Sequence, residues 1–163
     1  MDEERRIAVL EGSLDRHLGW IAAANDRTST AVTLALAMLG VLAAVSPTQM
    51  NRWTCAQGFF AATAAIDLLA CLVMCALAVF PRTTPPYDSL VFFGTVAKTT
   101  REQFEQAVRS LSEPSYLGDL AGQVHVNAII AATKFRWVQN ALRALFLAIV
   151  PWAAAVYLLY GAS

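Results

Sequence analysis

Three long stretches of the sequence are almost free of charge, and they constrain the fold more than any other feature. Residues 28–45 and 144–160 contain no charged side chain, and residues 59–80 contain only one, Asp67. A helix that crosses a bilayer needs about 20 mostly apolar residues. We therefore predict an all-α integral membrane protein with three transmembrane helices. The composition agrees with this prediction, because 57% of the residues are hydrophobic and only 15% are charged.

Lysine and arginine are unevenly distributed around these stretches. Four precede the first stretch and six separate the second from the third, with Arg143 at the edge of the third. Arg52 alone lies between the first two stretches, and no basic residue follows residue 160. Basic residues favour the cytoplasmic side of a membrane. The pattern predicts a cytoplasmic N-terminus, a cytoplasmic central segment and a C-terminus outside. The net charge of zero makes a nucleic acid polymer a poor partner.

The segments outside the predicted spans also have helical patterns. Apolar residues recur every three to four positions from Ile7 to Ile21, which predicts an amphipathic helix that continues into the first span. Pro81 and the pair 85–86 should end the second span, because proline cannot continue a helix. A capping box at residues 100–103 should open a short helix that Pro114 ends. Residues 115–160 then read as one long helix, cytoplasmic in its first half.

This reading divides the chain into four parts. Residues 1–27 form a cytoplasmic amphipathic helix, and residues 28–80 hold transmembrane helices one and two. Residues 81–140 form a cytoplasmic helical region, and residues 141–163 hold transmembrane helix three and an outer tail. The cytoplasmic module is thus expected to consist of the N-terminal helix, a short central helix and a long helix that is continuous with the last span.

The usual signatures of an enzyme are missing from the sequence. It contains no nucleophile beside a base, no glycine-rich phosphate loop and no metal-ligand spacing, so we expect no catalytic activity, no metal and no cofactor. The strongest constellation is a polar stripe along one face of the long predicted helix. It consists of Tyr116, Asp119, Gln123, Asn127 and Lys134. The stripe is either a solvated or helix-packing face, or a groove that binds a small anion through its ring, amides and cation.

Asp67 is the second unusual residue, because it lies in the middle of a predicted span. A carboxylate at that depth costs about 2.5 to 3.5 kcal/mol on insertion scales and is a functional hypothesis by default. It is expected to face another helix or a water-filled path, and a simple hydrogen bond between helices is the alternative. Two function classes follow from the residues alone. One is a small ion or proton channel or transporter subunit that uses Asp67, and the other is a passive membrane scaffold.

Several short elements, taken in chain order, resemble the transmembrane effector family of bacterial Pycsar antiphage defence. They are NDR at residues 25–27, SLVFFG at residues 89–94, the set Tyr116, Asp119 and Gln123, and AATKF at residues 131–135 before the last span. The first element is similar to the Asp-x-Lys-Ala element of that family, although residues 27–29 depart from it while a cation is retained. The resemblance extends from about residue 14 to residue 159.

The resemblance implies an effector in the bacterial inner membrane that stays inactive until a partner cyclase makes a cyclic pyrimidine mononucleotide. The ligand would be cyclic UMP or cyclic CMP, and the response would impair the membrane and halt the infected cell. The groups such a ligand needs are a cation, an aromatic ring and amides. The predicted ligand-binding residues are Tyr116, Asp119, Gln123, Asn127 and Lys134, with Asp26, Arg27, Phe92 and Phe93. The bilayer and further copies of the chain are the other expected partners, because small residues in the spans permit close helix approach.

Overall fold

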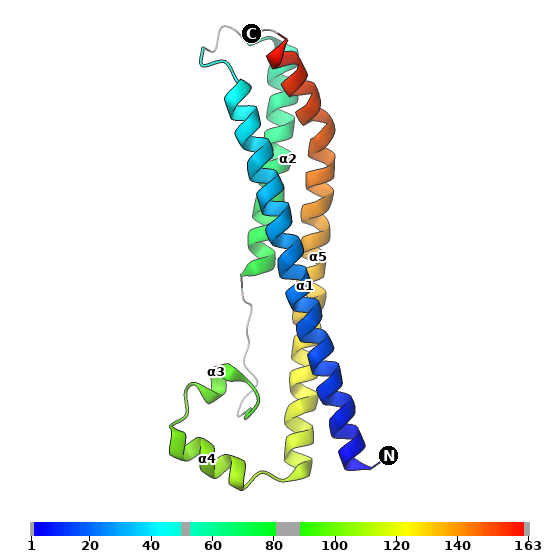
Figure 1. Ribbon diagram of the computed structural model, residues 1–163, viewed down its shortest axis with the longest axis vertical. Helices are drawn as coiled ribbons and strands as arrows, with labels where there is room; N and C mark the ends of the chain where they lie inside the picture. Colours follow the sequence, from blue (N-terminus) through cyan, green and yellow to red (C-terminus); the bar gives the residue numbers. More distant parts are fainter. Residues whose placement is uncertain (1, 50–52, 81–88, 162–163) are drawn as a thin grey trace. The chain divides into compact units, whose positions relative to one another are not determined.

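The computed structural model describes residues 2–49, 53–80 and 89–161, and every regular element in these ranges is a helix. The helices are α1 (Glu3–Val45), α2 (Cys55–Val79), α3 (Phe93–Val96), α4 (Arg101–Arg109) and α5 (Glu113–Tyr160) (Figure 1). Helices α1, α2 and α5 are long and apolar enough to cross a membrane. The all-α prediction with three spans is therefore confirmed, as is the expectation that the N-terminal helix continues unbroken into the first span.

The helix ends follow local sequence signals, with one correction. Thr100 and Gln103 form the predicted capping box at the start of α4. The prediction that Pro114 ends this helix is wrong, because α4 ends at Arg109 with Ser110 as its C-cap. Pro114 instead lies in the first turn of α5, where the missing N–H of proline has no intrahelical acceptor to lose. The prolines expected to end the second span lie outside the described residues, and α2 ends at Val79.

The chain forms two compact units. The membrane unit comprises Ala24–Phe80 and Lys134–Ser163, and the extramembrane unit comprises Met1–Ala23 and Pro81–Thr133. Helices α1 and α5 contribute residues to both units, because neither helix breaks at the boundary between them. The predicted division of the chain into four parts stays a prediction.

Heptad spacing explains how the three long helices pack inside the membrane unit. The buried residues of α2 alternate at intervals of four and three, which is the repeat of a coiled-coil seam. They are Gln57, Ala61, Ala64, Leu68, Cys71, Cys75 and Ala78. The buried residues of α1 follow the same repeat, at Ala24, Thr28, Ala31, Ala35 and Leu42. Most of these side chains are small, so the backbones can approach closely.

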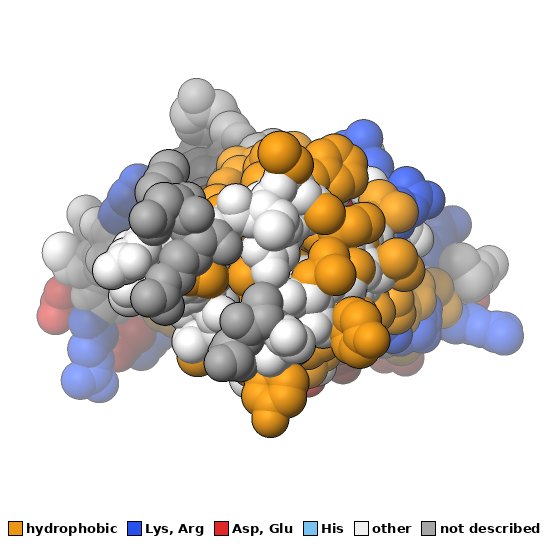
Figure 2. Space-filling view, turned by 90° about the horizontal axis from the view of Figure 1, so that it is seen from above, with side chains coloured by type: hydrophobic (Ala, Val, Ile, Leu, Met, Phe, Trp, Pro, Cys, Tyr) orange, Lys and Arg blue, Asp and Glu red, His pale blue; other side chains and the backbone are white. Residues whose placement is uncertain are grey.

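Large apolar side chains point away from this seam. Phe80 and Phe146 are 70% and 67% exposed, and Val150 is 74% exposed, while the alanines of the seam are buried. Figure 2 shows hydrophobic side chains gathered on the outer surface of the molecule. A water-soluble helical bundle would bury its large apolar residues and expose its small and polar ones. The observed arrangement fits helices whose surroundings are lipid.

Two long-range hydrogen bonds tie the membrane helices together. The Trp152 indole N–H of α5 donates to the carbonyl of Met38 in α1 at 2.9 Å. The Gln57 amide of α2 donates to the carbonyl of Leu158 in α5 at 3.0 Å. Polar side chains in a bilayer must find partners within the protein, since lipid tails offer none. These bonds therefore help to fix how α1 and α2 each align with α5.

Candidate ligand-binding site

A cluster of hydrogen bonds in the extramembrane unit holds the segment of residues 89–92 against α5. The carboxylate Oδ2 of Asp119 accepts the backbone N–H of Leu90 at 2.8 Å and that of Val91 at 3.3 Å. One turn later on α5, the Gln123 amide donates to Ser89 Oγ at 2.9 Å. A helix brings residues four apart to the same face, which explains why both side chains reach one segment. We call this arrangement, made of Ser89, Asp119, Gln123 and the amides that follow Ser89, the clasp.

Ser89 is the centre of the clasp, and it is not among the site residues predicted from the sequence. It is only 2% exposed, and besides Gln123 its hydroxyl accepts the backbone N–H groups of Val91 and Phe92. Serine commonly bonds to amides two and three residues ahead of it and thereby shapes a turn. The one sequence signal for this role was its place at the start of the SLVFFG element.

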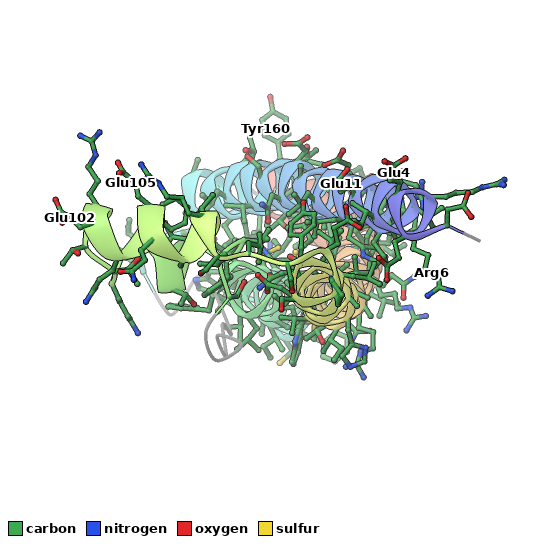
Figure 3. The ribbon with its side chains drawn as sticks, turned by 90° about the horizontal axis from the view of Figure 1, so that it is seen from below. Glu4, Arg6, Glu11, Glu102, Glu105 and Tyr160 are labelled. Carbon is green, nitrogen blue, oxygen red and sulfur yellow. The ribbon has the colours of Figure 1, made fainter. Side chains whose placement is uncertain are left out.

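Tyr116 lies one turn before Asp119, but its hydroxyl already has a partner on α1. The phenol donates to the Glu11 carboxylate at 2.8 Å. This bond raises the pKa of Tyr116 above its usual value, and burial and the charges of Glu11 and Asp119 raise it further. Figure 3 shows Glu11 on the N-terminal part of α1 and Glu102 and Glu105 on α4. The predicted stacking ring thus also links two helices of the extramembrane unit.

The remaining predicted residues of this unit have structural contacts as well. The Asn127 amide donates to the carbonyl of Gln123 at 2.9 Å, a bond within α5. The Phe92 ring packs so close to Gly94 that a Cβ on Gly94 would lie 2.6 Å from it. Glycine at this position therefore allows the ring to take its place. The side chain of Phe93 lies outside the described atoms.

Three of the four charged residues of the predicted site belong to the membrane unit. Lys134 Nζ donates to Asn25 Oδ1 at 2.8 Å, which joins α5 to α1. The Arg27 guanidinium lies 5.7 Å from the centre of the Phe135 ring, within the range of a cation–π contact. Asp26 is exposed on α1. Asn25 and Arg27 of the NDR element thus meet Lys134 and Phe135, the last two residues of the AATKF element, within one unit.

The structure therefore places the predicted ligand-binding residues in two groups. Tyr116, Asp119 and Gln123, with Asn127 and Phe92, belong to the extramembrane unit, and Asp26, Arg27 and Lys134 belong to the membrane unit. The expectation that one ligand contacts both groups stays a prediction. In the part of the chain that the structure describes, no group of three or more His, Cys, Asp or Glu could hold a metal ion.

Comparison with known families decides the assignment. The sequence model of the Pycsar effector protein domain, PycTM, matches residues 9–161, which is nearly the whole chain. The chain belongs to this family. No curated protein and no solved structure is significantly similar to it. Family membership and the three apolar helices make this Pycsar effector a multi-pass membrane protein of antiphage defence.

Asp67 is half-buried in α2 of the Pycsar effector, and no described residue forms a hydrogen bond with its carboxyl group. Its helix neighbour Thr63 uses its own hydroxyl on the carbonyl of Phe59 at 2.9 Å. The bonds that Trp152 and Gln57 form between the membrane helices do not involve it either. Because a polar group in lipid needs a partner, Asp67 stays a candidate for a contact outside this chain or for a water-filled path.

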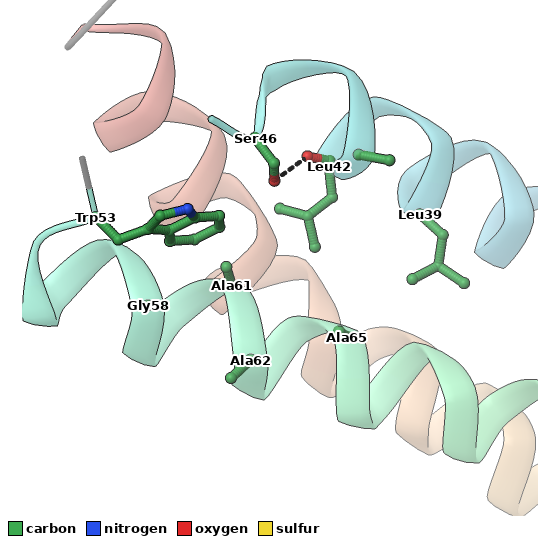
Figure 4. Close-up of a pocket in the computed structure, with 9 residues that line it drawn as sticks. Leu39, Leu42, Ser46, Trp53, Gly58, Ala61, Ala62 and Ala65 are labelled. Atoms are coloured by element: carbon green, nitrogen blue, oxygen red, sulfur yellow. Dashed lines mark hydrogen bonds between the residues drawn. The ribbon is translucent and has the colours of Figure 1, made fainter. Parts of the chain in front are cut away.

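An apolar cavity of about 600 Å³ lies between α1 and α2 in the membrane unit of the Pycsar effector (Figure 4). Small residues of α2 form one wall, namely Gly58, Ala61, Ala62 and Ala65. Ser46 points toward the cavity, but its hydroxyl donates to the carbonyl of Leu42 at 2.7 Å. The Trp53 indole likewise donates to the carbonyl of Pro47. The rest of the lining is apolar, so this cavity offers few polar contacts to a nucleotide.

Proposed function

We propose that this Pycsar effector senses a cyclic pyrimidine mononucleotide, cyclic UMP or cyclic CMP, and responds by impairing the inner membrane. The observation that carries the proposal is the clasp. Asp119 and Gln123 of α5, two residues of the predicted site, converge on the SLVFFG segment 29 and 34 residues away along the chain. The site therefore unites two of the sequence elements on which the resemblance rests.

The chemistry of the clasp suits recognition of a nucleotide. It presents consecutive backbone N–H groups, an amide and a hydroxyl, which are donors for phosphate oxygens and for the edges of a base. The Asp119 carboxylate accepts two of these N–H groups. An incoming ligand that takes these donors would compete with Asp119 and so favour a different position of the segment. Ligand binding and rearrangement are then coupled through the same hydrogen bonds.

The long helices supply the route to the bilayer. Asp119 lies on α5 and Glu11, the partner of Tyr116, lies on α1, and both helices also contain membrane-spanning segments. A shift of either helix therefore reaches the spans without passing through a loop. The ligand can move this equilibrium only by its difference in affinity for the two states, about 1.4 kcal/mol for each factor of ten.

Lys134 is the proposed contact for the phosphate. Among the described residues its ammonium bonds to the neutral Asn25 amide oxygen and to no carboxylate. A charge-assisted bond to phosphate is about twice as strong as one between neutral groups. If a phosphate oxygen replaced the Asn25 oxygen as the acceptor for Lys134, the bound state would therefore be favoured.

Calorimetry on the full chain in nanodiscs tests the proposal, with cyclic UMP, cyclic CMP and cyclic AMP as ligands. We expect binding of at least one pyrimidine nucleotide and weak or no binding of cyclic AMP. Dye-filled liposomes that contain the protein should then leak when the same nucleotide is added. If neither pyrimidine nucleotide binds, or if binding causes no leakage at saturation, the proposed function is wrong.

Conduction through Asp67 is a second candidate, favoured by the absence of a partner for this carboxyl group among the described residues. In that case several copies would surround a path, because three helices enclose little space, and leakage would not require any nucleotide. Liposome leakage without ligand, abolished by Asp67→Asn, would support this alternative over the sensing function.

A further inference from the structure

A second cavity lies in the extramembrane unit, beside the clasp. It has a volume of about 210 Å³ and lies among the segment that starts at Ser89, the short helix α3 and helix α4. Three hydroxyl side chains line it, those of Ser89, Thr95 and Thr99. Its apolar lining includes Leu90, Val96 and the Phe104 ring. None of the threonines, nor Phe104, belongs to the site predicted from the sequence.

The size of the cavity limits what can enter. Pockets that take a whole drug-sized ligand have volumes of about 300 to 1,000 Å³. At about 210 Å³ this cavity can hold only part of a nucleotide, such as one aromatic ring. The dimensions therefore suit a single nucleobase.

The Ser89 hydroxyl, which lines the cavity, has a proton that no described residue accepts. Ser89 Oγ accepts three N–H groups, from Val91, Phe92 and Gln123, but a hydroxyl also has one proton to donate. Among the described residues no acceptor takes this proton, although Ser89 is almost fully buried. A buried donor without an acceptor costs about 1 to 3 kcal/mol. A carbonyl oxygen inside the cavity would remove this penalty.

Together with Ser89, the two threonines supply hydrogen-bonding groups that match the polar edge of a pyrimidine base. Thr99 donates its proton to the carbonyl of Val96 at 2.8 Å, so its oxygen is left to accept an N–H. No described residue bonds to the Thr95 hydroxyl, which can donate or accept. Uracil and cytosine each present carbonyl oxygen together with N–H groups on this edge. Unpaired bases are commonly read there while they stack on an aromatic ring, a role that Phe104 can fill.

We propose that this cavity receives the pyrimidine base of the cyclic nucleotide. The proposal rests on the proposed function, since it assigns the base of the same ligand. The Ser89 hydroxyl donates to a carbonyl oxygen of the base, the Thr95 and Thr99 oxygens meet its remaining edge, and Phe104 covers a ring face. Ser89 belongs to both the cavity and the clasp. A base that bonds to Ser89 therefore changes the hydrogen bonds that hold residues 89–92.

Binding measurements on the full chain in nanodiscs test this assignment. Phe104→Ala should weaken binding of cyclic UMP or cyclic CMP roughly 5- to 150-fold, the range for loss of base stacking. Thr95→Val keeps the shape of the side chain and should weaken binding roughly 2- to 10-fold through one lost hydrogen bond. Ala107→Met should fill the cavity and weaken binding at least as much. Val108→Ala is the control, because Val108 lies on the same helix, is 47% exposed and does not line the cavity.

The outcomes separate the two proposals. If the unaltered chain binds neither pyrimidine nucleotide, the proposed function fails and the base site fails with it. If the unaltered chain binds and the Thr95→Val, Ala107→Met and Phe104→Ala variants all bind equally well, the cavity is not the base site while the sensing function stands. Far-ultraviolet circular dichroism checks that each variant is folded. Thr95→Val decides the matter if Phe104→Ala does not fold, because it removes no packing volume.

Discussion

Replacing Asp119 with alanine should release residues 89–92 from α5. The 2.8 Å bond from the Leu90 N–H to the carboxylate is charge-assisted, a class worth about 1.5 to 3 kcal/mol. The 3.3 Å bond from Val91 is longer than an ordinary N–H···O bond and adds little. Asp119 is half-buried, so water compensates part of the loss, and we expect local opening to become easier by about 1.5 to 2 kcal/mol.

Hydrogen exchange measured by mass spectrometry detects this opening directly. A difference of 1.4 kcal/mol corresponds to a factor of ten, so peptides that contain Leu90 and Val91 should exchange about 10- to 30-fold faster in Asp119→Ala. Asp119→Asn retains one acceptor oxygen and should show a smaller increase. Asp15→Ala is the matched control, because Asp15 is exposed in the same unit and no described residue bonds to it.

The reasoning would be refuted by unchanged exchange at residues 89–92 in Asp119→Ala. It would also be refuted if exchange rose equally throughout the extramembrane unit, because a global loss of stability differs from release of one segment. Added cyclic UMP or cyclic CMP provides a further check. If the ligand takes the N–H donors now bonded to Asp119, saturating ligand should give the Leu90 and Val91 amides the same exchange rate in Asp119→Ala as in the unaltered chain.

Three further predictions concern the charge of Lys134, the Asp67 carboxyl group in α2 and the topology of the chain in the membrane. Lys134→Ala should weaken binding of the cyclic nucleotide about 10- to 150-fold in calorimetry, through loss of one charge-assisted contact, whereas Lys98→Ala should leave it unchanged. Asp67→Leu should insert into membranes at least as well as the unaltered chain, since it removes a cost of about 2.5 to 3.5 kcal/mol, but should lose nucleotide-triggered leakage from liposomes. Reporter fusions should place Ser163 outside the inner membrane and residues near Pro86 in the cytoplasm.

Each of these predictions has a contrary result. Full affinity in Lys134→Ala would remove the lysine from the phosphate site. Undiminished leakage in Asp67→Leu would make that carboxyl group a bystander. A cytoplasmic reporter signal at Ser163 would contradict the charge-based orientation.

Features that depend on neighbours in the sequence could be predicted well. The three spans follow from the lengths of the apolar stretches, because the bilayer selects helices by hydrophobicity and length alone. The capping box of α4 could be found because Thr100 and Gln103 are only three residues apart. Pro114 shows the limit of such signals, since proline suits the first turn of a new helix as well as the end of an old one.

The candidate site could be predicted only in part. Asp119 and Gln123 were identified because helical spacing places them on one face of α5. Their partners could not be identified, since a hydrogen bond from Gln123 to Ser89 depends on how a separate segment packs. A polar stripe has the same spacing whether it faces water, a ligand or another part of the chain.

The class of protein follows from the amino-acid sequence alone: an all-α membrane protein with three spans and a polar stripe on its last helix. Which groups meet depends on how the chain packs. Tyr116 bonds to Glu11 across 105 residues, and Lys134 bonds to Asn25 across 109. Packing also forms the small cavity among Ser89, Thr95 and Phe104. Hydrophobic spans arise from local composition, whereas the partner of a polar side chain and the shape of a cavity depend on packing between segments far apart in the chain.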